Sequence, residues 1–565
     1  MTATKTPTKT PTETPTKTPT KTLVLARKAK PDGAGSGDSS EATAGPGGRS
    51  FRPGLFVAFA LVFVSIAFLY RDIRHDDAFI TLTYARNLSS GNGLTFNPGE
   101  KVLGTTSPLH AFMMAGVHRM FGDLLPVAAV ILGSLAFACQ GLCLYALVCR
   151  QSPILGLVLA GVAWTTIPTW LSLETYLFSV LVMATLAFQV HFKPISAGLC
   201  LGLAFLTRYD AGLLIGVVIL ESLLRDRRIP KVTLGISLIV VSPWLIGATL
   251  YFGSPLPQSL EAKKHLVSMS SYISHHVEFF SRAGWDTLSL HLVGGTVALR
   301  VTPILWIVGL SLVNRCLRDL RGLVIFSGLL FLAYSWIGPP VGQHWHMHVP
   351  QLTSIILGVL GLIGWPLAKR LEGERGPVRV PSESPERPSV AGVFPARQLA
   401  LILAGLIVLF GAINSVQSSK PLVASYWLGW RHGCYETIAK WCEEHIEPKQ
   451  RFIALEIGTL GYLTHHRMID PHGLINPTNQ YPRTYSKSDY LELLEMYKPT
   501  LVLMRSAEEG RWLETVTSMT MVRVFDWKTP WSTLLISNPE VLRNPTELDA
   551  LRMACAASTM EPAER

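Results

Sequence analysis

The sequence has few charged residues, and its cysteines form no recognisable metal or redox motif. Only 16% of the 565 residues are charged and 48% are hydrophobic, whereas a soluble globular domain typically has about 25% charged residues. The eight cysteines include no CxxC pair, so their spacing does not indicate a zinc site or a thiol–disulfide centre. These shortages exclude an ordinary soluble domain and indicate a protein embedded in a membrane.

The chain also lacks the basic pattern of a nucleic-acid-binding protein. Its net charge is +11, but Lys and Arg are concentrated in the N-terminal arm and between the apolar runs, as the positive-inside rule of membrane proteins describes. No basic face carries interleaved aromatic residues. We therefore expect membrane lipids, and no nucleic acid, as partners.

Three regions follow from the distribution of apolar residues. Residues 1–50 begin with Thr-Pro-Thr-Lys repeats, a composition that cannot bury a core and predicts a disordered cytoplasmic arm. Residues 51–416 contain apolar windows for about eleven membrane-spanning helices. Residues 417–565 are more polar and predict a soluble α/β domain.

The expected spans are 54–70, 123–148, 153–170, 175–191, 195–207, 211–224, 231–252, 299–315, 322–338, 350–367 and 398–416. The expected strands of the last domain are 451–455, 500–504 and 521–525.

The positions of the basic clusters predict the orientation of these spans. With the N-terminus inside, the main Arg and Lys clusters between spans fall on the cytoplasmic side. Residues 108–121 are apolar but contain His110 and Arg119, and we interpret them as an interfacial helix, because counting them as a span would move several basic clusters outside. The outer side then holds the loop 71–122, the segment 253–298 and the C-terminal domain.

Two adjacent carboxylates, Asp76 and Asp77, follow the first expected span. Ionised groups close to a bilayer are costly and usually functional, which makes this pair a candidate catalytic base. Neighbouring residues on a helix diverge, so both cannot aim at one atom. One caps the following helix while the other faces a substrate, or both are ordinary carboxylates at a helix N-terminus.

The loop around these aspartates resembles a known family. The run HDDAFITLTYARNLSSGNGLTFNPGEKVLGTTSPL is similar to the first outer loop of polyprenyl-phosphate-sugar glycosyltransferases of the C-type superfamily (GT-C), in the branch of the mycobacterial arabinofuranosyltransferases. Weaker matches follow in the same order: the segments around Glu174 and Arg208, the run from Tyr251 to Lys263, and the Gly, Asp and Asn-Pro elements of 456–477. Where family members often carry an arginine four residues before a proline, this chain has His346.

This resemblance implies an inverting glycosyltransferase with a GT-C membrane fold at the outer face of a bacterial cytoplasmic membrane. The donor would be a sugar, arabinofuranose among the candidates, on a polyprenyl phosphate, and the acceptor a hydroxyl of a glycan or glycoprotein. The implied catalytic residues are Asp76, Asp77 and Glu174. Arg208, Lys263 and His346 would hold the donor phosphate, since phosphate prefers guanidinium and ammonium partners.

Several alternatives stay open from the sequence. Glu174 is otherwise an interfacial charge that reaches water, and Lys263 belongs to a solvated lysine pair with Lys264. The period-two spacing of His344, His346 and His348 would place them on one face of an extended segment, where they bind a metal, pack or touch substrate. No cofactor is indicated, and a divalent cation is left open. The rival functions are a transporter or flippase for a lipid-linked saccharide and a receptor-like scaffold.

Overall fold

The computed structural model describes residues 51–259 except 73 and 167, then 296–337, 344–373, 430–504 except 449, 455 and 478–486, and finally 515, 520–522 and 533–536. The expected arm 1–50, the expected span 398–416 and Lys263 lie outside these residues. Within them the chain is mainly helical, with a small α/β region near its C-terminus. Its apolar helices, taken with the comparisons below, indicate a multi-pass membrane protein.

The helices of the first part follow the apolar windows closely. They are α1 (Phe51–Leu69), α2 (Asp76–Ser89), α3 (Pro108–Phe121), α4 (Leu125–Val148), α5 (Pro153–Trp164), α6 (Thr175–Val190), α7 (Pro194–Thr207), α8 (Ala211–Asp226), α9 (Lys231–Phe252), α13 (Thr296–Arg315), α14 (Arg321–Ile337) and α15 (His348–Gly373). The expected span 153–170 was too long, because its helix ends at Trp164. Its start is well defined: Pro153 occupies the first turn, and the Ser152 hydroxyl accepts the N–H of Leu155.

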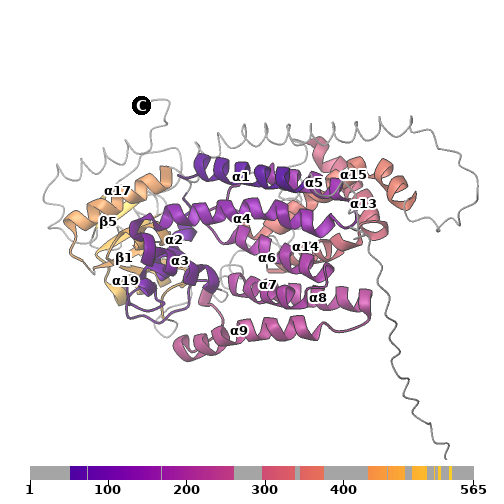
Figure 1. Ribbon diagram of the computed structural model, residues 1–565. Coiled ribbons are helices and arrows are strands. Elements are labelled where there is room, and N and C mark those ends of the chain that lie inside the picture. Colours follow the sequence, from indigo (N-terminus) through magenta and orange to yellow (C-terminus); the bar gives the residue numbers. More distant parts are fainter. Residues whose placement is uncertain are drawn as a thin grey trace, which may run out of the picture. The chain divides into compact units, whose positions relative to one another are not determined.

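Three helical stretches of the described residues are long and apolar enough to cross a membrane, namely Pro108–Val148, Lys231–Phe252 and Trp345–Ile363. The first joins α3 to α4 through a 3₁₀ turn at Gly122–Leu124. The interfacial position of 108–121 and the number of spans therefore stay predictions. Four of the helices pack side by side: α4 lies against α6, α6 against α7, and α7 against α9 (Figure 1).

Glycines let several of these helices approach closely. A Cβ on Gly198 of α7 would lie 2.5 Å from the Thr233 carbonyl of α9, and one on Gly202 would lie 2.7 Å from Val240. Such small residues allow helix backbones to pack directly in a membrane. One apolar cluster, which includes Leu147, Leu201 and Phe326, is shared by helices from α4 to α15.

The C-terminal region contains a five-stranded sheet in the order β2-β1-β3-β5-β4. Its elements are α17 (Trp430–His445), β1 (Arg451–Ala454), α18 (Gly458–Leu463), β2 (Arg467–Ile469), α19 (Lys487–Tyr497), β3 (Leu501–Met504), β4 (Thr520–Val522) and β5 (Thr533–Ile536). Strand β1 is parallel to β2 and β3, while β5 is antiparallel to β3 and β4. The strands expected at 451–455, 500–504 and 521–525 are confirmed as β1, β3 and β4, and β2 and β5 are additional. Residues 455 and 523–525 lie outside the described residues.

The outer loop and the C-terminal region share one apolar core. Tyr84 and Phe96 of the loop belong to the same buried cluster as Phe452, Leu460 and Leu501. Helix α2 packs directly on α18. This shared core holds the Asp76–Asp77 pair in contact with residues nearly 400 positions later in the chain.

Candidate functional site

Asp76 is bound to the start of helix α18. Its two carboxylate oxygens accept hydrogen bonds from the main-chain N–H groups of Gly458, at 2.9 Å, and Thr459, at 2.7 Å. The first N–H groups of a helix have no partner within it, and a carboxylate placed there also interacts favourably with the helix dipole. The expectation that one aspartate caps its own helix is wrong: α2 has no side-chain cap, and Asp76 caps α18.

Burial and neighbouring charge make the Asp76 carboxyl unusual. Burial, together with the negative charges of Glu456 and Asp77, raises the pKa of Asp76 to about 7, against the lowering effect of the Thr459 hydrogen bond. Glu456 is itself held by the Tyr435 hydroxyl, which donates to it at 2.6 Å. Asp76 therefore changes its protonation state in the neutral range, whereas an ordinary aspartate does so near pH 4.

Asp77 has different surroundings. It is exposed, while Asp76 is partly buried. Asp76 faces α18, and Asp77 is the more exposed of the two. Of the pair, Asp77 is the one that an incoming molecule meets first.

His75 connects this pair to a second segment, residues 169–174. Its Nδ1 lies 2.9 Å from the Ser172 hydroxyl, and its ring packs 4.9 Å from that of Trp170. Burial lowers the pKa of His75 to about 3, so this imidazole is neutral. The same segment packs directly on the backbone of α4 at Gly133, because a Cβ there would lie 1.8 Å from the Leu171 carbonyl oxygen.

Two residues beyond Ser172, Glu174 enters a buried ionic cluster around Arg208. The guanidinium lies 3.4 Å from Glu174 and donates to Asp210 at 2.9 and 2.5 Å. Arg208 and Glu174 are only 5% and 7% exposed, so the alternative in which Glu174 reaches water is wrong. A buried charge of this kind needs a partner, because an isolated one is costly to desolvate. Burial alone would lower the pKa of Arg208, but Asp210, Tyr334 and Glu174 raise it, which keeps the guanidinium charged.

His346 and Tyr334 complete the cluster. The Tyr334 hydroxyl accepts a hydrogen bond from Arg208 and donates one to Asp210, both at 2.8 Å. The His346 ring stacks on Tyr334 with a centroid separation of 5.0 Å, and its Nδ1 contacts the Arg208 guanidinium. His346, which stands where family members often carry an arginine, therefore lies beside Arg208.

The expected extended segment of alternating histidines is wrong. Residues His344–Met347 form a 3₁₀ helix that leads into α15. Because side chains no longer alternate as in a strand, His346 and His348 point to different partners: His348 contacts Gln140 at 2.8 Å and packs on Tyr176. In the part of the chain that the structure describes, no group of three or more His, Cys, Asp or Glu side chains could hold a metal ion.

The structure therefore brings together Glu174, Arg208 and His346. It links this cluster to the aspartate pair indirectly, because His75, next to Asp76, contacts Ser172, two residues before Glu174. A second link supports the same arrangement: Ser107 of the outer loop donates a 2.6 Å hydrogen bond to the Thr207 carbonyl, just before Arg208. Sequence reasoning missed Asp210, Tyr334 and Glu456 as members. Asp210 gave a signal through its position two residues after Arg208, and Glu456 through its place in the element 456–477 that resembles the family.

Comparisons with known proteins agree with the fold. A crystal structure of ArnT from Cupriavidus metallidurans bound to undecaprenyl phosphate aligns with a TM-score of 0.50 and 16% sequence identity, over 86% of this chain and 99% of that chain. The same protein in its apo state aligns with a TM-score of 0.50 and 15% identity, over 87% and 99%. At this identity the likeness concerns the fold.

The sequence comparisons are less informative. Residues 426–545 match a domain of unknown function, DUF8728. No curated protein matches the chain. The matched segment contains all five strands of the C-terminal sheet.

Proposed function

We propose that this chain is a GT-C glycosyltransferase that moves a sugar from a polyprenyl phosphate to an acceptor hydroxyl. The proposal is supported by one observation above all: the segment 169–174 contacts both the histidine beside the aspartate pair, through Ser172, and the buried arginine, through Glu174. A phosphate leaving group requires a cation, and an acceptor hydroxyl requires a carboxylate that takes its proton. The ArnT fold adds support, because the lipid in that structure, undecaprenyl phosphate, is what remains when a polyprenyl-phosphate sugar gives up its sugar.

In this proposal Asp77 is the general base. Its carboxylate takes the proton of the acceptor hydroxyl as the oxygen attacks the anomeric carbon. The bond from that carbon to the phosphate oxygen breaks, and polyprenyl phosphate leaves with the electron pair. The attack comes from the face opposite the leaving group, so the anomeric configuration inverts. A base of this kind contributes about a hundred- to ten-thousand-fold to the rate.

Asp76 is then a positioning residue. Both of its oxygens are used by Gly458 and Thr459, so it fixes the start of α2 and with it the direction of Asp77. Its pKa of about 7 suits a proton acceptor as well, which makes the comparison of the two Asn variants informative.

Arg208 and His346 would meet the donor phosphate, with Lys263 as a further cation expected from the sequence. Two carboxylates already neutralise Arg208, so an arriving phosphate has to compete with Asp210 and Glu174 for the guanidinium. Because a guanidinium only donates, His346 accepts from Arg208 at Nδ1, and in this role it would orient the guanidinium toward the phosphate. Charge stabilisation of the departing phosphate is the main contribution expected of this cluster.

The finer assignments belong to the same proposal. The sugar would be arabinofuranose and the acceptor a glycan or glycoprotein, at the outer face of a bacterial cytoplasmic membrane, with the N-terminus inside and the C-terminal domain outside. These points rest on the resemblance of the outer loop and on the charge distribution between spans.

Reconstitution of the purified chain tests the proposal against a transporter. A defined polyprenyl-phosphate sugar and a soluble acceptor are supplied on the same side of the membrane. A transferase forms glycosylated acceptor and free polyprenyl phosphate, whereas a transporter or flippase moves the donor lipid between leaflets and forms neither. Movement without product would contradict the proposal.

A further inference from the structure

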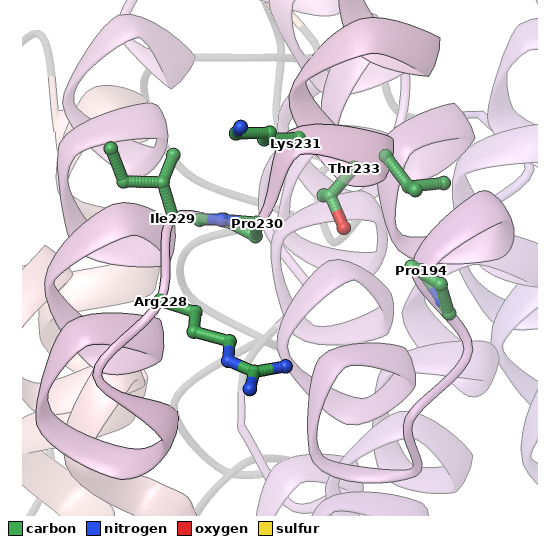
Figure 2. Close-up of a pocket in the computed structure, with 7 residues that line it drawn as sticks. Pro194, Arg228, Ile229, Pro230, Lys231 and Thr233 are labelled. Atoms are coloured by element: carbon green, nitrogen blue, oxygen red, sulfur yellow. The ribbon is translucent and has the colours of Figure 1, made fainter. Parts of the chain in front are cut away.

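A cavity of about 570 Å³ lies at the opposite end of helix α7 from Arg208. Its lining residues are Pro194, Arg228, Ile229, Pro230, Lys231, Val232 and Thr233. They come from the start of α7, the α8–α9 connection and the first turn of α9, as Figure 2 shows. Since α7 has 14 residues and a helix rises 1.5 Å per residue, this cavity is about 20 Å from the Arg208 cluster.

The cavity offers unpaired positive charge. Among the described residues, neither Arg228 nor Lys231 has an ion-pair partner, whereas the nearby Arg225 is paired with Asp226 at 3.1 Å. No acidic side chain lines the space. An anion would therefore be attracted without having to displace a carboxylate, in contrast to the situation at Arg208.

Hydrogen-bond donors accompany these cations. Thr233 is 2% exposed, and its hydroxyl, which faces the same space as Arg228 in Figure 2, has no hydrogen-bond partner among the described residues. Helix α9 starts at Lys231 after Pro230 without a side-chain cap. The first turn bonds through Lys231 and Leu234 N–H groups, and within the described chain no acceptor is found for those of Val232 and Thr233. Free N–H groups at a helix start favour a phosphate.

The surroundings of the cavity are apolar and exposed. Ile195, Ile229 and Val232 are 64%, 54% and 53% exposed, although they adjoin helices that are otherwise packed. A soluble anion would leave these side chains in water, but the acyl chains of a lipid would cover them. Basic pockets between membrane helices bind anionic headgroups in the same way.

We propose that this cavity binds the phosphate headgroup of an anionic phospholipid from the surrounding leaflet. Arg228 and Lys231 neutralise the phosphate, the Thr233 hydroxyl and the first N–H groups of α9 donate to it, and Ile195, Ile229 and Val232 contact the acyl chains. The lipid bridges α7 and α9, whose close approach through Gly198 and Gly202 supports the floor of the cavity. The site is separate from the proposed transfer reaction.

The test uses the full-length chain in nanodiscs that contain phosphatidylglycerol or phosphatidylcholine, with the retained lipid counted by native mass spectrometry. We expect phosphatidylglycerol to be retained in preference to phosphatidylcholine. The double variant Arg228→Gln/Lys231→Gln should retain phosphatidylglycerol about tenfold less tightly. The matched control Arg225→Gln/Arg227→Gln removes the same charge from the C-terminal end of α8, outside the cavity, and should retain phosphatidylglycerol normally.

Two further variants keep the test decisive if the double variant Arg228→Gln/Lys231→Gln folds poorly. Arg228→Lys/Lys231→Arg preserves both charges and should preserve binding, and Thr233→Val, of similar shape, should weaken it by removing one donor. Equal loss in the control pair, or equal retention of phosphatidylcholine, would overturn the proposal. Displacement of the lipid by millimolar inorganic phosphate would show a site for soluble anions and would overturn it too.

Discussion

Asp76 and Thr459 are 383 residues apart in the sequence and are joined by a hydrogen bond of 2.7 Å from the Thr459 N–H to the Asp76 carboxylate. With the neighbouring bond from Gly458, it attaches the start of the outer-loop helix to the C-terminal α/β region. This contact distinguishes the roles of Asp76 and Asp77, which look equivalent in the sequence. One is committed to holding two parts of the chain together, and its neighbour is exposed.

Stability should depend on pH through Asp76. Its pKa is raised from 3.8 to about 7 in the folded chain, so the folded state binds the proton more tightly than the unfolded state. The associated stability is present below about pH 4 and is lost as the pH rises through 7. We expect the thermal unfolding midpoint to fall between about pH 4 and pH 7 and to level off at higher pH, and Asp76→Asn to reduce this fall.

Asp72→Asn is the matched control for that measurement. The Asp72 side chain is 86% exposed and pairs only loosely with Arg71, at 3.4 Å. Its replacement should leave the pH dependence as in the unaltered chain. If the unfolding midpoint of Asp76→Asn fell with pH as steeply as that of the unaltered chain, a group other than Asp76 would cause the pH dependence.

Gly458 should be intolerant of a side chain. A Cβ there would lie 1.8 Å from the Asp76 carbonyl oxygen, so Gly458→Ala must push α18 away from α2. We expect a loss of about 1–3 kcal/mol, as for other overpacked sites, and faster amide hydrogen exchange in both helices. Gly116→Ala, where a Cβ would meet nothing within 4 Å, should be neutral; the same loss there would point to a general effect of alanine.

The helices of the first part were predictable because each needs a long apolar stretch, which composition alone reveals. The strands were less so: all five have only three or four residues, so a period-two pattern hardly stands out in any of them, and β2 and β5 were missed. The candidate site was predictable only as separate residues. Glu174 and Arg208 are 34 positions apart on different helices, and no local pattern fixes how two spans align. The bond from Gly458 to Asp76 crosses 382 positions and depends on a core that forms only when the loop meets the last domain.

Even the conservative substitution Arg208→Lys should weaken donor binding. Lysine keeps the charge but loses the fork that reaches Glu174, Asp210 and Tyr334 together. We expect Arg208→Lys to raise the KM for the lipid donor about tenfold, since bidentate contacts are the stronger ones, with a smaller change in the KM of the acceptor. Arg225→Lys, at the other end of α8, is the control. An unaltered donor KM would remove Arg208 from the phosphate site.

The central claim is tested most directly by the release of polyprenyl phosphate from a defined polyprenyl-phosphate sugar in the presence of an acceptor. The account predicts acceptor-dependent release by the unaltered chain. It predicts a kcat about a hundred- to ten-thousand-fold lower in Asp77→Asn, a smaller loss in Asp76→Asn, and normal turnover in Asp72→Asn. No release by the folded, unaltered chain with any lipid-phosphate sugar, or full turnover in both Asp76→Asn and Asp77→Asn, would contradict it.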